Sequence, residues 1–272
     1  MSPANEAGPD GLPTFLIRDI PPVSPTEIPI EQPEVYYGED MRDYVIVKTK
    51  APEFDFPKGD ENVYTDYEGT GGVALSSFFR KLLFALRFTD PFVLVTGNLT
   101  DQSRIIFDRH IGTQASEVNP RRFSKIAPFL KFDSDPYLVV SDGRLKWIQD
   151  AYTVSSMFPY AEPYGRPYVR ELNYIRNSVK AVMDAYDGSV DLYVWDDQDP
   201  IIQTYQDIFP DLFKPGSELP ETLRAHIRYP MDLFRTQSSL YNSYHMTSPQ
   251  VFYNREDVWE PATEIYGVSE RT

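Results

Sequence analysis

The sequence contains no cysteine among its 272 residues. Disulfide bonds, thiolate catalysis and metal sites built from cysteine are therefore excluded. Long apolar runs are missing as well. The most apolar stretch, 73–88, carries Arg80, Lys81 and Arg87, whereas a membrane-spanning helix needs about 18 or more nearly uncharged residues. The N-terminus has neither a basic start nor an apolar run, so we expect no cleavable signal peptide.

Basic residues are scarce relative to acidic ones, 26 against 41, and the net charge is −15. This excess argues against nonspecific binding to nucleic acid or to anionic lipid, because both repel an acidic protein. Hydrophobic residues make up 41% of the chain, which is enough for a sizeable buried core. The composition therefore indicates a globular protein without nucleic acid among its partners.

Proline is concentrated at the N-terminus, where it disfavours helix and promotes extended backbone. Because Phe15, Ile17 and Ile20 are apolar, we expect this segment to pack on the domain surface from about Leu12 onward. We predict a proline-rich extended arm over 1–35, a single domain over 36–260 and a frayed tail over 261–272. The range 159–170, punctuated by proline and glycine, is a candidate subdomain boundary.

Hydrophobic periodicity predicts an α+β fold, in which several amphipathic helices pack on a mixed or mainly antiparallel sheet. The clearest signal is a β-hairpin at about 137–148, where Asp142 and Gly143 suit the positive φ angles of a type I′ turn. A long strand should continue to about Ser155. We predict further strands at 44–47, 92–95 and 190–195, and helices at 75–86, 100–111, 120–127, 175–186, 200–209, 218–227 and 230–244.

Candidate chemistry centres on an acidic stretch, 181–213, that has eight aspartates and no basic residue. Asp196, Asp197 and Asp199 follow the strand at 190–195 and could supply three oxygen ligands to calcium. The same carboxylates could act as general acid and base in sugar hydrolysis, which needs two of them roughly 5–10 Å apart. The simpler interpretation is turn formation and helix capping, because Asp199 precedes Pro200 at a predicted helix start.

Other motifs are weak. The stretch from Gly69 to Ala74 matches a loose G-x-G-x-x-A dinucleotide fingerprint, but no predicted strand precedes it. The three histidines, His110, His226 and His245, lack metal-ligand spacing. We therefore expect no cofactor, and the residues alone assign no catalytic or ligand-binding role.

Several blocks of the sequence together carry a resemblance. They are Tyr36–Gly38, Asp133–Val140 with Asp142 and Gly143, Asn173–Lys180 running into Asp184–Gly188, Leu223–Pro230, Asp232–Phe234, Tyr244–Met246, Pro249–Tyr253 and Trp259. In combination they make the chain resemble a family of uncharacterised, large, multi-pass bacterial membrane proteins. The blocks cover most of the chain between Leu12 and Pro261.

The resemblance implies a topology in which a bundle of transmembrane helices precedes a large extracytoplasmic region, and this chain would be part of that region. The implied partners are the transmembrane portion of the same protein and other envelope proteins, at the cell membrane. The family has no established reaction, so no site residue is carried over. We expect a binding or assembly module of the cell envelope. The alternatives are a carboxylate-dependent hydrolase acting on envelope glycans or lipids, and a calcium-stabilised scaffold domain.

Overall fold

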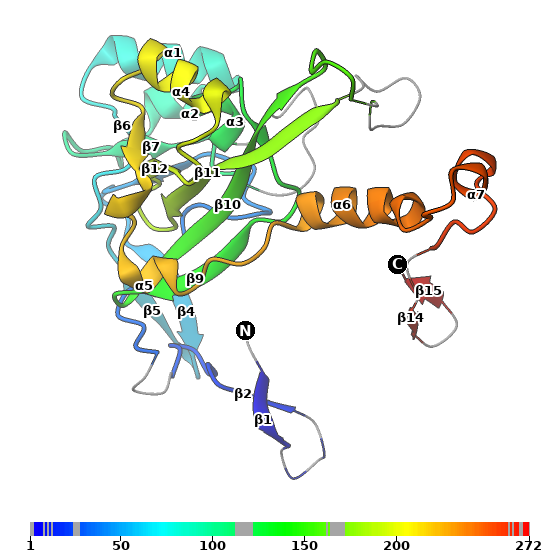
Figure 1. Cartoon of the computed structure of the whole chain (residues 1–272). Coiled ribbons are helices and arrows are strands. Elements are labelled where there is room, and N and C mark those ends of the chain that lie inside the picture. The colour runs from blue at the N-terminus through cyan, green and yellow to red at the C-terminus, as the bar shows by residue number, and fades with distance from the viewer. Residues whose placement is uncertain are drawn as a thin grey trace.

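The structure is a computed structural model that describes residues 3–7, 9, 11, 13–23, 28–111, 122–161, 163, 172–260, 262, 264–266 and 269–271 (Figure 1). Its helices are α1 Phe78–Phe88, α2 Phe92–Val95, α3 Arg122–Ile126, α4 Pro200–Ile208, α5 Glu221–Arg224, α6 Met231–Tyr244 and α7 Pro249–Asn254, with a 3₁₀ turn at Gly216–Glu218. The fold is α+β with mostly antiparallel sheets, as predicted.

A six-stranded sheet organises the domain. It has the order β13–β12–β11–β10–β8, and β9 pairs with β10. All pairs are antiparallel except β12 with β13. Its strands are β8 Lys131–Phe132, β9 Tyr137–Ser141, β10 Arg144–Ser155, β11 Tyr174–Asp184, β12 Val190–Val194 and β13 Phe213–Pro215.

Smaller sheets surround this one. Three strands form a second sheet in the order β3–β7–β6: β3 Val45–Val47, β6 Val73–Ala74 and β7 Arg104–Ile106. Three separate antiparallel hairpins complete the fold. They are β1 Pro3–Ala7 with β2 Pro13–Phe15, β4 Glu53–Lys58 with β5 Glu61–Thr65, and β14 Glu264–Tyr266 with β15 Ser269–Arg271.

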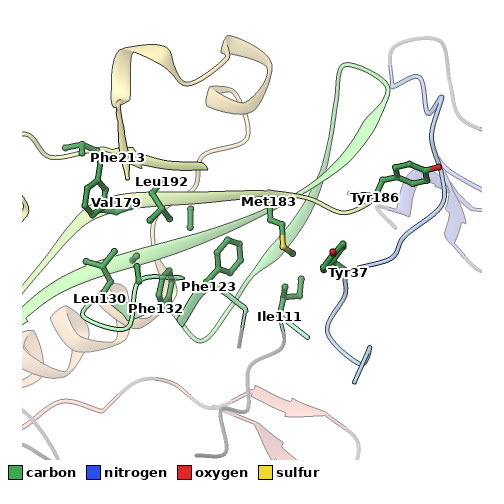
Figure 2. Packing of buried hydrophobic residues seen from close by; sticks show 14 of the residues in the cluster. Tyr37, Ile111, Phe123, Leu130, Phe132, Val179, Met183, Tyr186, Leu192 and Phe213 are labelled. Atoms are coloured by element: carbon green, nitrogen blue, oxygen red, sulfur yellow. The ribbon is translucent and has the colours of Figure 1, made fainter. Parts of the chain in front are cut away.

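The two faces of the main sheet bury different clusters because side chains alternate along a strand. Val179, Ala181 and Met183 of β11 point into the larger cluster, together with Phe123 of α3 and Ile202 of α4 (Figure 2). The opposite face buries Ile148, Val182 and Tyr193 beneath Leu219 and Leu223, which come from the 3₁₀ turn and α5. Both faces are therefore covered over much of the sheet.

The predicted hairpin is confirmed. β9 and β10 pair through Arg144 opposite Ser141, and the turn residues Asp142 and Gly143 have φ angles of 52° and 74°. The predicted strands near 44–47 and 190–195 and the predicted helices near 120–127, 200–209 and 230–244 are also present. In the predicted helix range 218–227 only the short α5 forms after the 3₁₀ turn.

The helix predicted at 175–186 is wrong, because this segment is the strand β11. Its apolar residues match helical spacing only because both faces of the strand are buried. A strand covered on both sides reads as a nearly continuous apolar run and hides its period of two. The β-branched residues Ile175, Val179 and Val182 suit the strand.

Two further predictions, the strand at 92–95 and the helix at 100–111, are wrong, because the first segment is helical and the second contains a strand. Residues 92–95 form α2, whose first turn is capped by the carboxylate of Asp90, which accepts from the Phe92 amide at 2.9 Å. Residues 104–106 form β7. The hydroxyls of Thr100 and Ser103 donate to the Lys48 carbonyl at 2.8 and 3.0 Å, so they fix a turn against the neighbouring chain and do not cap a helix.

The N-terminal arm packs on the domain over a shorter range than predicted. Phe15 is 52% exposed and Ile20 is 72% exposed, so the predicted packing of these two side chains on the domain is wrong. Packing begins later: the amides of Glu31 and Tyr36 donate to the carbonyls of Gly143 and Ala185 at 2.8 Å each. The range 261–272, predicted as a frayed tail, contains the paired strands β14 and β15. The candidate boundary at 159–170 falls mostly outside the described residues, and the division into arm, domain and tail stays a prediction.

Candidate functional site

The three carboxylates singled out in the sequence lie in one loop between β12 and α4. Asp199 is fully buried and caps α4, accepting from the Ile201 amide at 3.1 Å. It also accepts hydroxyl hydrogen bonds from Ser178 at 2.6 Å, Tyr174 at 2.7 Å and Thr153. Burial by itself raises the pKa of Asp199, but these donors outweigh it and hold the pKa below its usual range. Asp199 is therefore an ionised structural cap.

Asp196 and Asp197 lie nearer the surface. The carboxylate of Asp196 pairs with Arg176, and that of Asp197 accepts from the Gln198 side-chain amide at 2.9 Å. Within the described part of the chain, no group of three or more histidine, aspartate or glutamate side chains is placed to hold a metal ion. The geometry thus gives no support to Asp196, Asp197 and Asp199 as calcium ligands, and it favours the capping interpretation for Asp199.

The loop borders two grooves that share Trp195 and Asp197. One, of about 570 Å³, runs toward Gly216, Ser217 and Arg224. The other, of about 640 Å³, runs between the sheet and the start of α6 and is lined by Arg176, Lys180, Arg228 and Leu233, among others. Trp195, which is 39% exposed, lines both.

Lys180, one of the residues that line the larger groove, belongs to a buried ion pair. Lys180 of β11 and Asp150 of β10 stand opposite one another in the sheet, and their side chains are 2% and 3% exposed. The Asn177 amide also donates to Asp150 at 3.1 Å. Burial raises the pKa of Asp150, and Lys180 and Asn177 offset this only in part. The sequence prediction missed this pair because it placed Lys180 on a helix; a lysine inside an apolar run was the available signal.

Cations gather around Trp195 although the chain as a whole is acidic. The Lys180 ammonium lies 5.2 Å and the Arg224 guanidinium 5.4 Å from the centre of its ring. Neither groove has a histidine in its described lining, and Asp199 has no free lone pair to offer a substrate. Because the Lys180 charge is already paired with Asp150, it is the Trp195 ring and Arg224 that are suited to holding a polar or anionic group. Asp196 and Asp197 both line the larger groove, but Asp196 is paired with Arg176, so the arrangement does not favour the acid–base pair of the hydrolase alternative.

Helix α6 is fastened to the domain at its beginning. The Asp232 amide donates to the Asp133 carboxylate at 2.9 Å. In return the Asp232 carboxylate accepts from the Ser134 amide at 2.8 Å and the Ser134 hydroxyl at 2.6 Å. Beyond this clamp α6 runs away from the main body toward α7 (Figure 1). We call the segment from Met231 to Glu260 the α6–α7 arm.

The α6–α7 arm is rich in exposed apolar side chains. None of the 14 residues of α6 is buried. The arm nevertheless folds back on itself, because the Trp259 ring stacks on His245 at 3.7 Å and its amide donates to the Asn242 carbonyl at 3.0 Å. The large apolar side chains left exposed are Met231, Phe234, Leu240, Tyr241, Tyr244, Phe252, Tyr253, Val258 and Trp259.

A family model described as "Uncharacterised protein family (UPF0182)" matches residues 1–271. The chain belongs to this family. A UPF0182 protein of Sulfurovum sp. is 54% identical over the whole chain, and so is one of Desulforamulus reducens. A UPF0182 protein of the archaeon Methanospirillum hungatei is 47% identical over 98% of the chain, so the family is not confined to bacteria. No solved structure matches the chain.

Membership of UPF0182 confirms the resemblance to an uncharacterised family of large proteins. The chain spans only 29%, 28% and 29% of the length of these three UPF0182 relatives, so it corresponds to a piece of a much longer protein. Among the described residues, none of the helices has the length and apolar character that crossing a membrane requires.

Proposed function

We propose that this chain is an extracytoplasmic portion of a UPF0182 membrane protein and acts there as an assembly and binding module of the cell envelope. The observation that carries the proposal is the α6–α7 arm. A helix of 14 residues that buries none of them lacks the packing that stabilises most protein helices, since isolated helices shorter than about 12–15 residues are marginal in water. Such a helix is expected to gain its packing from a partner.

The partner that fits best is the remainder of the same polypeptide, including its membrane portion, with other envelope proteins as the second class. Relatives are more than three times as long as this chain, as the 28–29% coverage shows. Their additional residues would therefore be present at high local concentration near the arm. The exposed side chains of Phe15, Leu16 and Ile20 offer a second surface of the same kind.

The grooves beside Trp195 supply the binding part of the proposal. An aromatic ring with Arg224 against it suits a polar ligand that carries negative charge, such as an acidic sugar of the envelope. No described residue favours the hydrolase or the calcium scaffold over this interpretation.

The extracytoplasmic placement can be tested by labelling, because this chain contains no cysteine of its own. A cysteine introduced by Asp60→Cys lies in the exposed turn between β4 and β5. In a full-length UPF0182 protein otherwise freed of cysteine, we expect a membrane-impermeant maleimide to label this residue in intact cells.

Permeabilised cells provide the matched reference, and a cysteine in a cytoplasmic marker protein should stay unlabelled until the cells are opened. Labelling of the Asp60→Cys variant only after permeabilisation would place this domain inside the cell and contradict the proposal.

A further inference from the structure

Helix α1 carries its apolar stripe on the side that faces away from the domain. Its inward side is held by Ala85, which is buried, and by the rings of Phe84 and Phe88, which lie 5.4 and 6.0 Å from that of Phe107. Tyr44 stacks on Phe88 at 4.5 Å. The sequence pattern alone would have placed the opposite stripe in the core, as is usual for an amphipathic helix.

Exposed apolar side chains of α1 and of the neighbouring helix α2 together make up a surface that we call the α1–α2 face. Its side chains are between 66% and 75% exposed. They are Phe78, Phe79, Leu83, Leu86, Phe92 and Val95. Contiguous apolar surface of this kind usually marks a contact site for protein or membrane.

The charge around the α1–α2 face is opposite to that of the chain as a whole. Between Gly69 and Thr89 there is no aspartate or glutamate, although the chain has 41 of them. The same stretch carries Arg80, Lys81 and Arg87. At the far end of α2, the Lys50 ammonium donates to the Gly97 carbonyl at 3.0 Å. Acids lie beside α1 and not within it: Asp90 lies between α1 and α2, and Asp108 pairs with Arg87 at 3.6 Å. An apolar helix that carries cations and no acid of its own, as α1 does, is typical of helices that lie in the interface of an anionic membrane.

We propose that the α1–α2 face docks onto the surface of a lipid bilayer that contains anionic headgroups. Phe78, Phe79, Leu83 and Leu86 would enter the region between headgroups and acyl chains, and Arg80 would contact the phosphates. Arg87, whose guanidinium pairs with Asp108 at 3.6 Å and is about half exposed, would add to the positive charge beside them. A second copy of the chain fits less well. In a twofold symmetric dimer the same patch meets itself, which would bring the cations of both copies together.

This proposal goes beyond the function proposed above and does not depend on it. The negative net charge predicts that anionic lipid repels the molecule as a whole. Docking therefore requires a surface whose local charge is positive, and the α1–α2 face provides one. The docking surface is also separate from the α6–α7 arm, and the two can be tested with different variants.

The test is sedimentation of this chain with vesicles of 30% phosphatidylglycerol and 70% phosphatidylcholine, and with pure phosphatidylcholine. We expect binding to the anionic vesicles that weakens with added salt. The double variant Leu83→Asp/Leu86→Asp should bind at least about 100-fold more weakly, because two apolar side chains are removed and two negative charges are added. Arg80→Gln/Arg87→Gln should lose about fivefold per cation on anionic vesicles only.

The matched control is Phe234→Asp/Leu240→Asp, which makes the same kind of change on exposed positions of α6. Since all four side chains are exposed, circular dichroism should show an unchanged fold in both double variants. The proposal is overturned if the unaltered chain does not bind vesicles, or if the α6 variant loses binding while the α1 variant retains it. Self-association that is abolished by Leu83→Asp/Leu86→Asp, without vesicle binding, would assign the face to a second copy.

Discussion

Replacing Lys180 by methionine should lower the free energy of unfolding by about 3–5 kcal/mol, the cost of leaving a buried charge without its partner. Asp150 lies opposite Lys180 in the sheet, and both side chains are almost completely buried. With Lys180→Met, Asp150 loses its cation and keeps the hydrogen bond from the Asn177 amide at 3.1 Å. Urea unfolding followed by circular dichroism measures the loss.

The double variant Lys180→Met/Asp150→Leu distinguishes the cost of an unpaired buried charge from the cost of losing the lysine side chain itself. Because an apolar pair of similar volume often replaces a buried ion pair without cost, we expect it to recover most of the stability. Lys214→Met is the control: Lys214 pairs with Asp191 at 2.7 Å, but both side chains are more than 40% exposed, so the change should stay within about 1 kcal/mol. Equal losses at Lys180 and Lys214 would contradict the account.

The second large effect is expected at Asp199. Asp199→Asn replaces one carboxylate oxygen by an amide that cannot accept from the donors around it. The N-cap of α4 and the hydrogen bonds from Ser178, Thr153 and Tyr174 are weakened together. We expect a loss of about 2–4 kcal/mol, since hydrogen bonds to charged groups and helix caps each contribute appreciably.

The pH dependence of this effect has a definite sign. The folded pKa of Asp199 is lower than its unfolded value, which is about 3.9, so its contribution is fully present above that pH. It is lost as pH falls through the lower folded pKa, and the difference between wild type and Asp199→Asn should shrink there. Asp197→Asn, at an exposed position of the same loop, should change stability by no more than about 0.5 kcal/mol at any pH. A constant Asp199 difference down to strongly acid pH would rule out an ionised cap.

Predictions from the sequence were correct where a turn or a helix start depends on residues that are adjacent in the chain. The Asp142–Gly143 turn needs positive φ at both residues, and the hairpin forms as predicted. Asp199 before Pro200 marks a helix start, and α4 begins there. Both depend on residues adjacent in the chain, so no knowledge of the tertiary structure was needed.

Where the predictions from sequence failed, tertiary packing determined the structure. β11 is buried on both faces, and its period of two was therefore hidden. The helix predicted at 75–86 is present as α1, but its apolar periodicity does not show which side faces the domain: Phe84, Ala85 and Phe88 face inward and the broader stripe faces outward. The carboxylates of the candidate site were found from the sequence, whereas Lys180 and Trp195 beside them became visible only once β10, β11 and β12 were aligned in one sheet.

The assembly role is tested most directly by photocrosslinking from the α6–α7 arm. Benzoylphenylalanine placed at Tyr241 or Tyr253, which are 60% and 87% exposed, should crosslink in a full-length UPF0182 protein to residues outside the segment that corresponds to this chain, or to another envelope protein. Tyr160, which is fully exposed outside the arm, provides the comparison position. We predict strong, position-specific crosslinks from the arm and weak ones from Tyr160. Crosslinks from Tyr241 and Tyr253 no stronger than those from Tyr160 would mean that the arm has no partner, and would contradict the assembly role.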